Sequence, residues 1–107
     1  MNPIIEAKKP EIIALCRQYG VIKLDLFGSA TGPHWDQERS DFDFIVAFED
    51  YRPGIATRLI GFSDALAALL ERPVDLVFDR AMKPRMRAFV APQRESVYER
   101  NHRTVAA

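Results

Sequence analysis

Three short segments with a period of two constrain this chain more than any other feature of its sequence. Residues 21–27 place apolar side chains at alternate positions, residues 41–48 repeat the pattern with a row of phenylalanines, and residues 74–78 repeat it again after Pro73. Because successive side chains of a strand point to opposite faces of a sheet, each segment predicts a β-strand with one buried face.

Helical patterns lie before and between these strands. Apolar residues recur at helical spacing from Pro10 to Gly20. Pro10 suits the first turn of a helix, where its missing N–H costs nothing, and Gly20 suits the left-handed residue that ends one. We therefore expect a helix that begins at Pro10, with residues 4–9 forming an earlier turn or a separate short helix.

A second helical pattern covers about residues 55–71, a third lies near 84–91, and a short element near 95–100 follows. The order helix, strand, strand, helix, strand, helix predicts an α/β (α+β) fold, in which a small mixed sheet carries helices packed on one face. The 107 residues fit one compact domain spanning residues 1–107.

Charge and cysteine content exclude several classes of protein. Fifteen basic and fifteen acidic residues cancel, which argues against a general nucleic-acid binder. Cys16 is the single cysteine, so an intrachain disulfide and a thiolate metal cluster are excluded, and we expect it to be a small buried residue. With no signal-peptide pattern and no apolar run of the ~18–20 residues that cross a bilayer, we expect a cytoplasmic protein without membrane association.

Asp41 and Asp43 stand out in the second strand segment. Residues two apart on a strand share a face and lie roughly 6.6 Å apart, so both should project from the face opposite the phenylalanines. Acidic residues are depleted in strand interiors, although Asp41 alone would also suit a strand boundary. Two adjacent carboxylates repel each other, and their pKa values should rise unless a cation lies between them. Mg²⁺ prefers such oxygen ligands.

Asp75 interrupts the third strand segment in the same way. If this strand lies beside the second, Asp75 joins Asp41 and Asp43 on one face. Three carboxylates can hold two ions roughly 3.5–4 Å apart, the arrangement used for in-line nucleotidyl displacement. Asp75 would then be the carboxylate best placed to help deprotonate an acceptor hydroxyl.

Gly28 and Ser29 follow the first strand segment. Glycine lets the backbone approach a phosphate closely, and the N–H groups of such a turn, with the Ser29 hydroxyl, could grip the β- and γ-phosphates of a nucleotide. A Gly-Ser pair alone is weak evidence. Its value comes from its position beside the aspartates.

These pieces together resemble the signature of the DNA polymerase β-like nucleotidyltransferase superfamily. The resemblance lies in residues 26–32 (LFGSATG) and 38–46 (ERSDFDFIV), and is closest to the minimal, antitoxin-type (MntA-like) branch. Residues 71–77 (ERPVDLV) are similar to that branch's third-aspartate strand, and Tyr98-Glu99 resembles its C-terminal end. The likeness extends over about residues 5–100.

The resemblance implies a polymerase β-like fold and a Mg²⁺-dependent transferase that uses ATP or another nucleotide triphosphate. Residue by residue, Gly28 and Ser29 fall on the phosphate-gripping positions. Asp41 and Asp43 fall on the paired metal ligands, and Asp75 falls on the third carboxylate, which is also a metal ligand.

A protein partner is implied by the resemblance as well. Relatives of this kind are often encoded beside a HEPN-domain ribonuclease toxin, which they neutralise by adding AMP to a tyrosine, by binding, or both. A catalytic antitoxin acting on a HEPN-type toxin is therefore expected, and an antitoxin that works by occlusion alone stays open. A transferase for small molecules is disfavoured, because 107 residues leave no second domain to enclose such a substrate.

One position departs from the family pattern. Many relatives carry an arginine before the second glycine of the loop, whereas Thr31 precedes Gly32 here. The phosphate contact of that arginine is therefore lost here, or it is supplied elsewhere, by Arg39 or by a basic cluster. The alternative interpretation of the cluster is a solvated helix face. The cluster comprises Arg80, Lys83, Arg85 and Arg87.

His34 and Trp35 lie between the two halves of the motif. His34 is expected to be an exposed loop residue, with a nucleotide contact as the alternative. Trp35 could stack on a base or anchor a partner, but local packing is the expected use.

Overall fold

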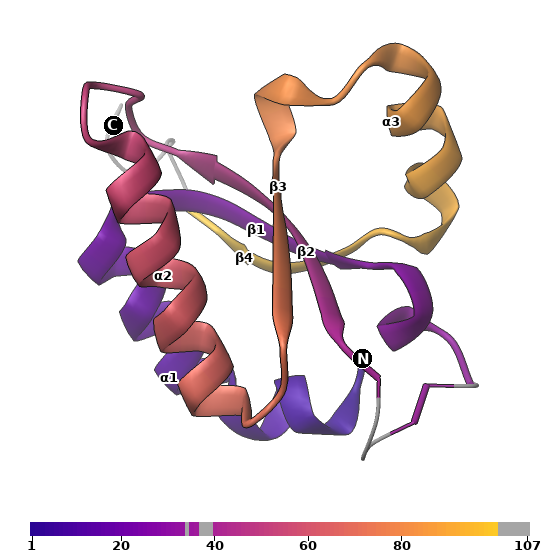
Figure 1. The fold of residues 1–107 in the computed structure, drawn as a ribbon. Helices are drawn as coiled ribbons and strands as arrows, with labels where there is room; N and C mark the ends of the chain where they lie inside the picture. The colour runs from indigo at the N-terminus through magenta and orange to yellow at the C-terminus, as the bar shows by residue number, and fades with distance from the viewer. Residues whose placement is uncertain (34, 37–39, 101–107) are drawn as a thin grey trace, which may run out of the picture.

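The computed structural model describes residues 1–33, 35–36 and 40–100. These residues form a four-stranded sheet with two long helices on one side and a short helix on the other (Figure 1). The helices and strands are α1 (Pro3–Tyr19), β1 (Val21–Phe27), β2 (Phe42–Phe48), α2 (Ile55–Leu70), β3 (Val74–Phe78), α3 (Pro84–Val90) and β4 (Glu95–Glu99). Three 3₁₀ turns join them: η1 (Gly28–Thr31), η2 (Asp79–Ala81) and η3 (Ala91–Gln93).

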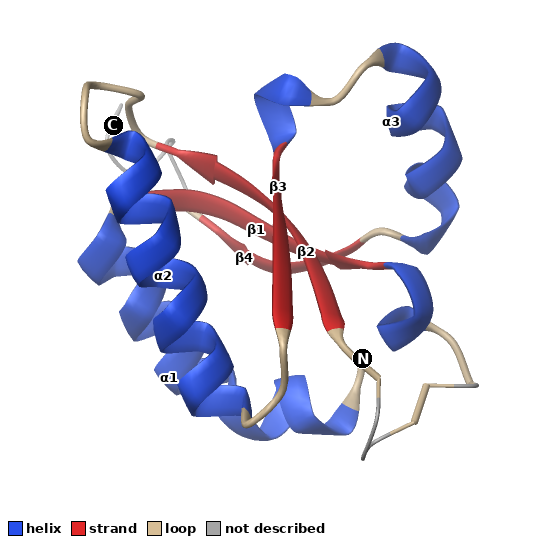
Figure 2. Ribbon diagram, viewed as in Figure 1, coloured by secondary structure: helices blue, strands red, loops and turns tan. Residues whose placement is uncertain are grey.

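The sheet is mixed, as the sequence predicts. Its strand order is β3-β2-β1-β4, with β1 antiparallel to both of its neighbours (Figure 2). β2 and β3 are parallel, and α2 supplies the crossover that a parallel pair requires. The third strand segment therefore lies directly beside the second, which is the condition for bringing Asp75 to the other aspartates.

The expectation for the first helix was wrong at its start. α1 is continuous from Pro3, with Asn2 as the cap that accepts a hydrogen bond of 2.9 Å from the first turn. Pro10 lies inside the helix, where its ring removes one backbone hydrogen bond. The buried side chains of Ile5 and Ile12 on either side of Pro10 anchor both halves to the core, and this packing outweighs the local cost.

The main core fills the space between the sheet and the two long helices. It is built on the phenylalanine row, of which Phe42 and Phe44 are fully buried against α1 and α2. Cys16 is buried here, as expected, and burial raises the pKa of its thiol to about 12. Among the described helices, none is both long and apolar enough to span a membrane.

A smaller cluster lies on the opposite face of the sheet. There Met82 and Val90, from the segment around α3, pack on Ile45 of β2 together with Phe27 and Val77. The prediction that helices cover one face therefore holds for α1 and α2, while α3 covers part of the other face (Figure 1). The aspartates of interest project from this second face.

Candidate functional site

Asp43 of β2 and Asp75 of β3 are direct neighbours across the sheet. They are register partners in the parallel pair, so their side chains share a face and lie side by side. The adjoining positions on each strand, Phe42 with Val74 and Phe44 with Leu76, point into the main core instead. The backbone thus brings together two of the carboxylates singled out from the sequence.

The Asp43 carboxyl carries the electrostatic signature of this crowding. Burial raises its pKa, and the negative charges of Asp75 and Asp41 raise it further. A hydrogen bond to Asp75 also stabilises the protonated form of Asp43. The sequence predicts this direction for adjacent carboxylates without a cation between them, and for Asp43 the prediction is confirmed.

Asp41 lies just outside the strand. β2 begins at Phe42, one residue later than the sequence pattern suggests, and Asp41 is exposed. The backbone carbonyl of Asp41 accepts a hydrogen bond of 3.2 Å from the indole Nε1 of Trp35. The Trp35 ring packs on Phe42 with 4.7 Å between ring centroids, so the expected local packing of Trp35 is confirmed.

The three aspartates do not form a closed cage. Among the residues that the structure describes, no group of three His, Cys, Asp or Glu side chains lies close enough together to hold a metal ion. Asp43 and Asp75 meet, while Asp41 lies farther out and adds its charge. The donor chemistry of the meeting pair fits a hard, oxygen-preferring cation such as Mg²⁺, because the cation would relieve the repulsion between them. The binding of two metal ions at this site remains a prediction.

Gly28 forms the other wall of the site. Its φ of 76° lies in the left-handed region, and a Cβ at this position would stand 3.1 Å from Oδ2 of Asp43. The turn that follows is closed by Thr31 Oγ1, which donates to the Gly28 carbonyl at 2.8 Å, and by the Gly32 N–H, which donates to the Ser29 carbonyl at 3.0 Å. Ser29 is exposed on this turn.

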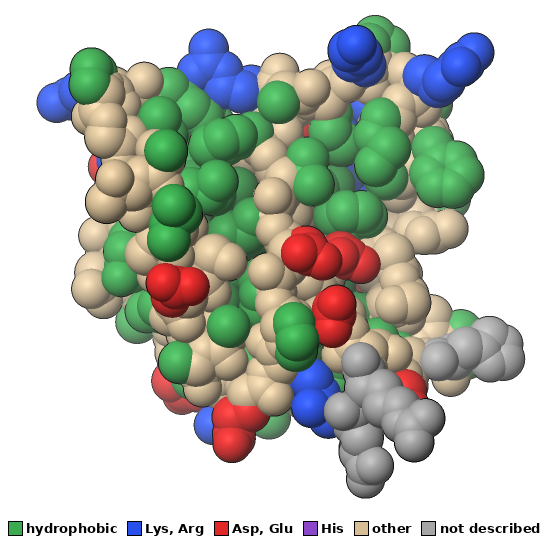
Figure 3. Space-filling model, in the orientation of Figure 1, with side chains coloured by type: hydrophobic (Ala, Val, Ile, Leu, Met, Phe, Trp, Pro, Cys, Tyr) green, Lys and Arg blue, Asp and Glu red, His purple; other side chains and the backbone are tan. Residues whose placement is uncertain are grey.

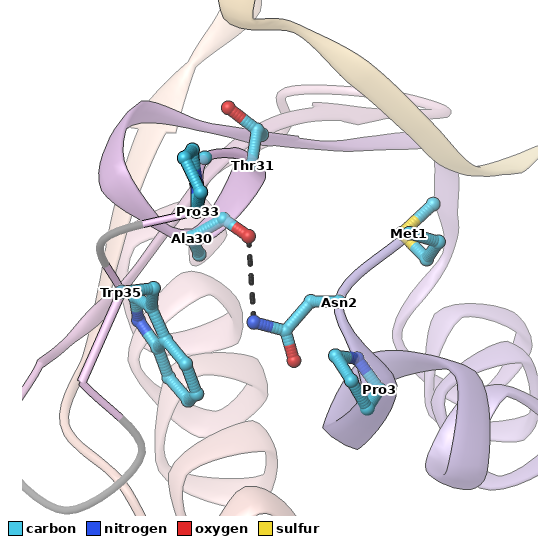
Figure 4. Close-up of a pocket in the computed structure, with 8 residues that line it drawn as sticks. Met1, Asn2, Pro3, Ala30, Thr31, Pro33 and Trp35 are labelled. Atoms are coloured by element: carbon cyan, nitrogen blue, oxygen red, sulfur yellow. Dashed lines mark hydrogen bonds between the residues drawn. The ribbon is translucent and has the colours of Figure 1, made fainter.

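Two cavities border the turn. The smaller has a volume of about 260 Å³ and is lined by Gly28, Ser29, Thr31, Gly32, Pro33 and Gln93. The larger, of about 410 Å³, lies between the turn and the start of α1, with Trp35 on one side and Asn2 on the other (Figure 4). Asn2 Nδ2 donates to the Ala30 carbonyl at 3.3 Å and ties the helix start to the turn.

A second charged cluster on the same face was missed in the sequence. Asp25 of β1 is only 2% exposed and accepts a hydrogen bond from Nε of Arg94. The same Arg94 donates to Asp79 at 3.1 Å, and Arg87 donates to Asp79 at 2.8 Å. The signal that identified Asp43, an acidic residue inside an apolar strand, was present at Asp25 as well.

Arginines set the charge state of this second cluster. Burial alone would raise the pKa of Asp79, but hydrogen bonds from Arg87 and Arg94 and their positive charges hold it below its usual range. Burial disfavours the charged Arg94, but hydrogen bonds to the two aspartates and their negative charges outweigh that effect and raise the pKa of the guanidinium. Lys23 Nζ lies 3.5 Å from Oδ2 of Asp25 and adds a further positive charge, so cationic side chains offset the negative charge of this cluster.

The predicted basic cluster divides by role. Arg87 belongs to the network just described, and the Arg80 guanidinium stacks over the Tyr51 ring at 4.0 Å. Lys83 and Arg85 are exposed, as expected for a solvated face. The alternatives that involved His34 and Arg39 lie outside the described residues.

Comparisons with known proteins identify the class. The family model described as "Polymerase beta, Nucleotidyltransferase" matches residues 10–103. A structure described as a minimal nucleotidyltransferase is 31% identical, with 83% of this chain and 88% of that chain covered and a TM-score of 0.69. Among curated proteins, none matches significantly.

Two solved complexes share the fold. A toxin–antitoxin structure with AMP-PNP is 26% identical, with 92% of this chain and 78% of that chain covered and a TM-score of 0.66. A complex from Shewanella oneidensis, of a tri-AMPylated HEPN toxin with its MNT antitoxin, is 22% identical with a TM-score of 0.65. The match covers 95% of this chain and 77% of that chain, and at this sequence identity it is evidence for a shared fold alone.

The mixed sheet, its β2–α2–β3 crossover and the turn after β1 define a nucleotidyltransferase domain. The chain belongs to the polymerase beta nucleotidyltransferase family.

Proposed function

We propose that this protein transfers AMP from ATP to a protein hydroxyl, a tyrosine of a HEPN-type toxin, in a Mg²⁺-dependent reaction, and acts as that toxin's antitoxin. One observation carries the proposal: Asp43 and Asp75 lie in register with Gly28 directly against Asp43. The related fold occurs in a complex with an AMPylated HEPN toxin and in a toxin–antitoxin pair with AMP-PNP. We place the reaction in the cytoplasm, in keeping with the free thiol of Cys16.

The phosphate and metal sites are assigned from position. Asp43, Asp75 and Asp41 would hold Mg²⁺, which when bound neutralises phosphate charge. The backbone N–H groups after Gly28, with the hydroxyl of Ser29, would bind the β- and γ-phosphates in the adjoining cavity of about 260 Å³. Gly28 is required because any side chain there would meet Asp43.

Asp75 is assigned to the acceptor. It is exposed on the edge strand β3, where an incoming hydroxyl can reach it. In the proposed step the acceptor oxygen forms a bond to the α-phosphorus, the bond between that phosphorus and the bridging oxygen breaks, and pyrophosphate leaves. The hydroxyl proton passes to the Asp75 carboxylate.

The test is radiolabelled transfer. The chain is incubated with α-labelled ATP, Mg²⁺ and the product of the neighbouring reading frame, which the proposal expects to be a HEPN-type toxin. We expect label on the partner, located at a tyrosine by mass spectrometry, and loss of that label with Asp43→Asn or Asp75→Asn. Asp64→Asn is the matched control, because Asp64 is exposed on α2 away from the site. Undiminished labelling in Asp43→Asn would refute the assignment.

A second candidate function is inhibition by occlusion alone. The observation that favours it is Thr31, which stands where many relatives carry an arginine and directs its hydroxyl to the Gly28 carbonyl. Under this alternative, the double variant Asp43→Asn/Asp75→Asn protects cells from the HEPN-type partner as well as the unaltered chain does. Loss of protection in that variant would exclude occlusion as the sole mechanism.

A further inference from the structure

α3 exposes two large apolar side chains on one side. Phe89 is 71% exposed and Met86 is 41% exposed, and residues three apart on a helix are neighbours on its surface. Four large apolar residues are exposed among those described, and two of them occupy this seven-residue helix. Figure 3 shows apolar side chains gathered over α3, with basic side chains along its upper edge.

The same segment concentrates positive charge. Residues 79–94 contain five basic residues and one acidic residue, although the whole chain is neutral. Arg87 and Arg94 are bound to aspartates of the second cluster, whereas Lys83 and Arg85 are exposed beside the apolar pair. The face therefore combines an apolar centre with a basic rim. We call it the α3 face, made of Lys83, Arg85, Met86 and Phe89.

The α3 face stands next to the proposed active site. Val90 and Met82, which anchor the α3 segment, pack against Ile45 and Val77. Ile45 and Val77 lie two residues along the same strands from Asp43 and Asp75, on the same side of the sheet, which is a distance of roughly 6.6 Å. A protein bound to the outer side of α3 can thus reach the two carboxylates with residues a few positions away from those that contact α3.

Ion pairs hold α3 in this position. Arg87 joins the helix to Asp79, and Arg94 joins Asp79 to Asp25 in the central part of the sheet. The buried apolar residues beneath the segment are only Ile45, Met82 and Val90 among those described, with Phe27 and Val77 partly buried beside them, and the ion pairs add to this small apolar attachment. A braced helix with exposed apolar side chains is preorganised for a partner.

We propose that the α3 face is the docking surface for the protein that receives the nucleotide, and that this partner presents an apolar pocket edged by Asp or Glu. The inference rests on the proposed function, whose protein acceptor it describes more closely. An exposed aromatic and a methionine inside a charged rim have the composition of a protein–protein interface centre. The basic rim selects an acidic partner and accelerates its association.

The experiment measures partner binding and transfer separately. The partner tested is the product of the neighbouring reading frame, the HEPN-type toxin that the proposed function expects, and its affinity is determined by calorimetry for Phe89→Ser and Arg85→Glu. We expect the dissociation constant to rise at least tenfold for Phe89→Ser, as for an interface centre, and the effect of Arg85→Glu to shrink at high salt. Ile60→Ser is the matched control: Ile60 is 59% exposed on α2, across the sheet from α3, and its change should leave the affinity within twofold.

Thermal melts of the same variants show that the changes act on binding, because substitutions of exposed side chains should leave the melting temperature nearly unchanged. At saturating partner, AMP transfer by Phe89→Ser should return to the wild-type rate. An unchanged affinity in Phe89→Ser overturns the docking proposal and leaves the proposed function intact. A wild-type chain that binds its partner through this face without labelling it overturns the proposed function and leaves the docking surface.

Two further measurements exclude other occupants. ATP binding is followed by the fluorescence of Trp35, the single tryptophan of the chain, and should be equal in wild type and Arg85→Glu. A weaker ATP affinity in that variant would assign the basic rim to the nucleotide and overturn the proposal. Binding of a single-stranded oligonucleotide that is lost in Phe89→Ser would assign the face to nucleic acid and overturn it as well.

Discussion

Two acidic clusters share one face of the sheet and differ in what surrounds them. Asp25 and Asp79 are bridged by Arg94, and the pKa of Asp79 is lowered. Asp43 and Asp75 lie against each other, and the pKa of Asp43 is raised. No ion pair to Asp43 or Asp75 occurs among the residues that the structure describes.

The difference shows how one fold assigns the same residue type to two tasks. Burying a carboxylate is costly unless a positive charge or hydrogen-bond donors compensate it, and Arg94 provides both for Asp25. The Asp43 pair lacks such compensation within the described chain, and in the proposed function Mg²⁺ from solution would relieve its repulsion. Perturbed carboxylates of this kind are typical of functional sites. Substitutions in each cluster can test whether the two divide in this way.

The largest expected effect is on activity. Asp43→Asn should reduce AMP transfer roughly 100-fold or more, because loss of a ligand for the catalytic cation removes several kcal/mol of transition-state stabilisation. The melting temperature without Mg²⁺ should not fall, since the substitution also removes repulsion from Asp75 and Asp41. Single-turnover transfer and thermal melts on the same preparation measure both quantities. An inactive Asp43→Asn whose melting temperature has also fallen by several degrees would show that Asp43 is structural. The proposed difference between the two acidic clusters would then be wrong.

The second cluster should respond in the opposite sense. Asp25→Ala removes a buried carboxylate and leaves the partly buried Arg94 guanidinium with only Asp79 as its partner, and should lower the free energy of unfolding by about 2–3 kcal/mol. For a domain of this size that corresponds to a fall in Tm of roughly 10 °C or more. Chemical denaturation measures the change, with the exposed Asp64→Ala as control. If Asp25→Ala is as stable as wild type but inactive, Asp25 belongs to the active site instead.

Local patterns were enough to locate the carboxylate pair. The alternation in residues 41–48 and 74–78 identified both strands and the faces of Asp43 and Asp75, because side-chain direction in a strand depends only on sequence parity. A parallel pair joined by a helix then brings the two positions together. The glycine of the turn was found because it follows directly after a strand.

Contacts distant in sequence were not accessible in the same way. Asp25 and Arg94 are 69 residues apart, and nothing local to either one names its partner. The side of the sheet that α3 covers depends on the path of the chain after β3, and seven residues of helix carry too weak a pattern to fix it. Pro10 was misplaced for a related reason, since the packing of α1 overrides the local preference of proline.

Gly28→Ala should reduce stability and ligand binding by a smaller amount. Comparison with a control glycine separates the effect of backbone strain from the effect of contact with Asp43. At a φ of 76° an alanine is strained by about 1–2 kcal/mol, and its Cβ would stand 3.1 Å from Oδ2 of Asp43. Gly54→Ala is the matched control, because Gly54 has a φ of 97° and a Cβ added there would meet no described atom within 4 Å. Both variants should lose similar stability in melts, and Gly28→Ala alone should weaken Mg²⁺ and ATP binding. Equal ATP affinity in the two variants would remove Gly28 from the site.

The smallest effect is a pH dependence whose sign distinguishes the clusters. The pKa of Asp43 is higher in the folded chain than its ordinary value of 3.8, so the folded state holds that proton more tightly. The resulting stability is present below the unfolded value and is lost as pH rises through the folded value. The stability from Asp79, whose pKa is lowered, is present above the unfolded value and is lost as pH falls through the folded value.

Melts of Asp43→Asn and Asp79→Asn against wild type, from acid to neutral pH and without divalent ions, measure the two signs. The melting temperature of Asp43→Asn should increase relative to wild type as pH rises. That of Asp79→Asn should fall below wild type over the same rise in pH. Mg²⁺ at ten times its dissociation constant should then stabilise wild type by about 1.4 kcal/mol, and Asp43→Asn far less. An Asp43→Asn difference that stays flat with pH, or that Mg²⁺ leaves unchanged, means that the pair stores no repulsion for a cation to relieve. The two clusters would then be alike.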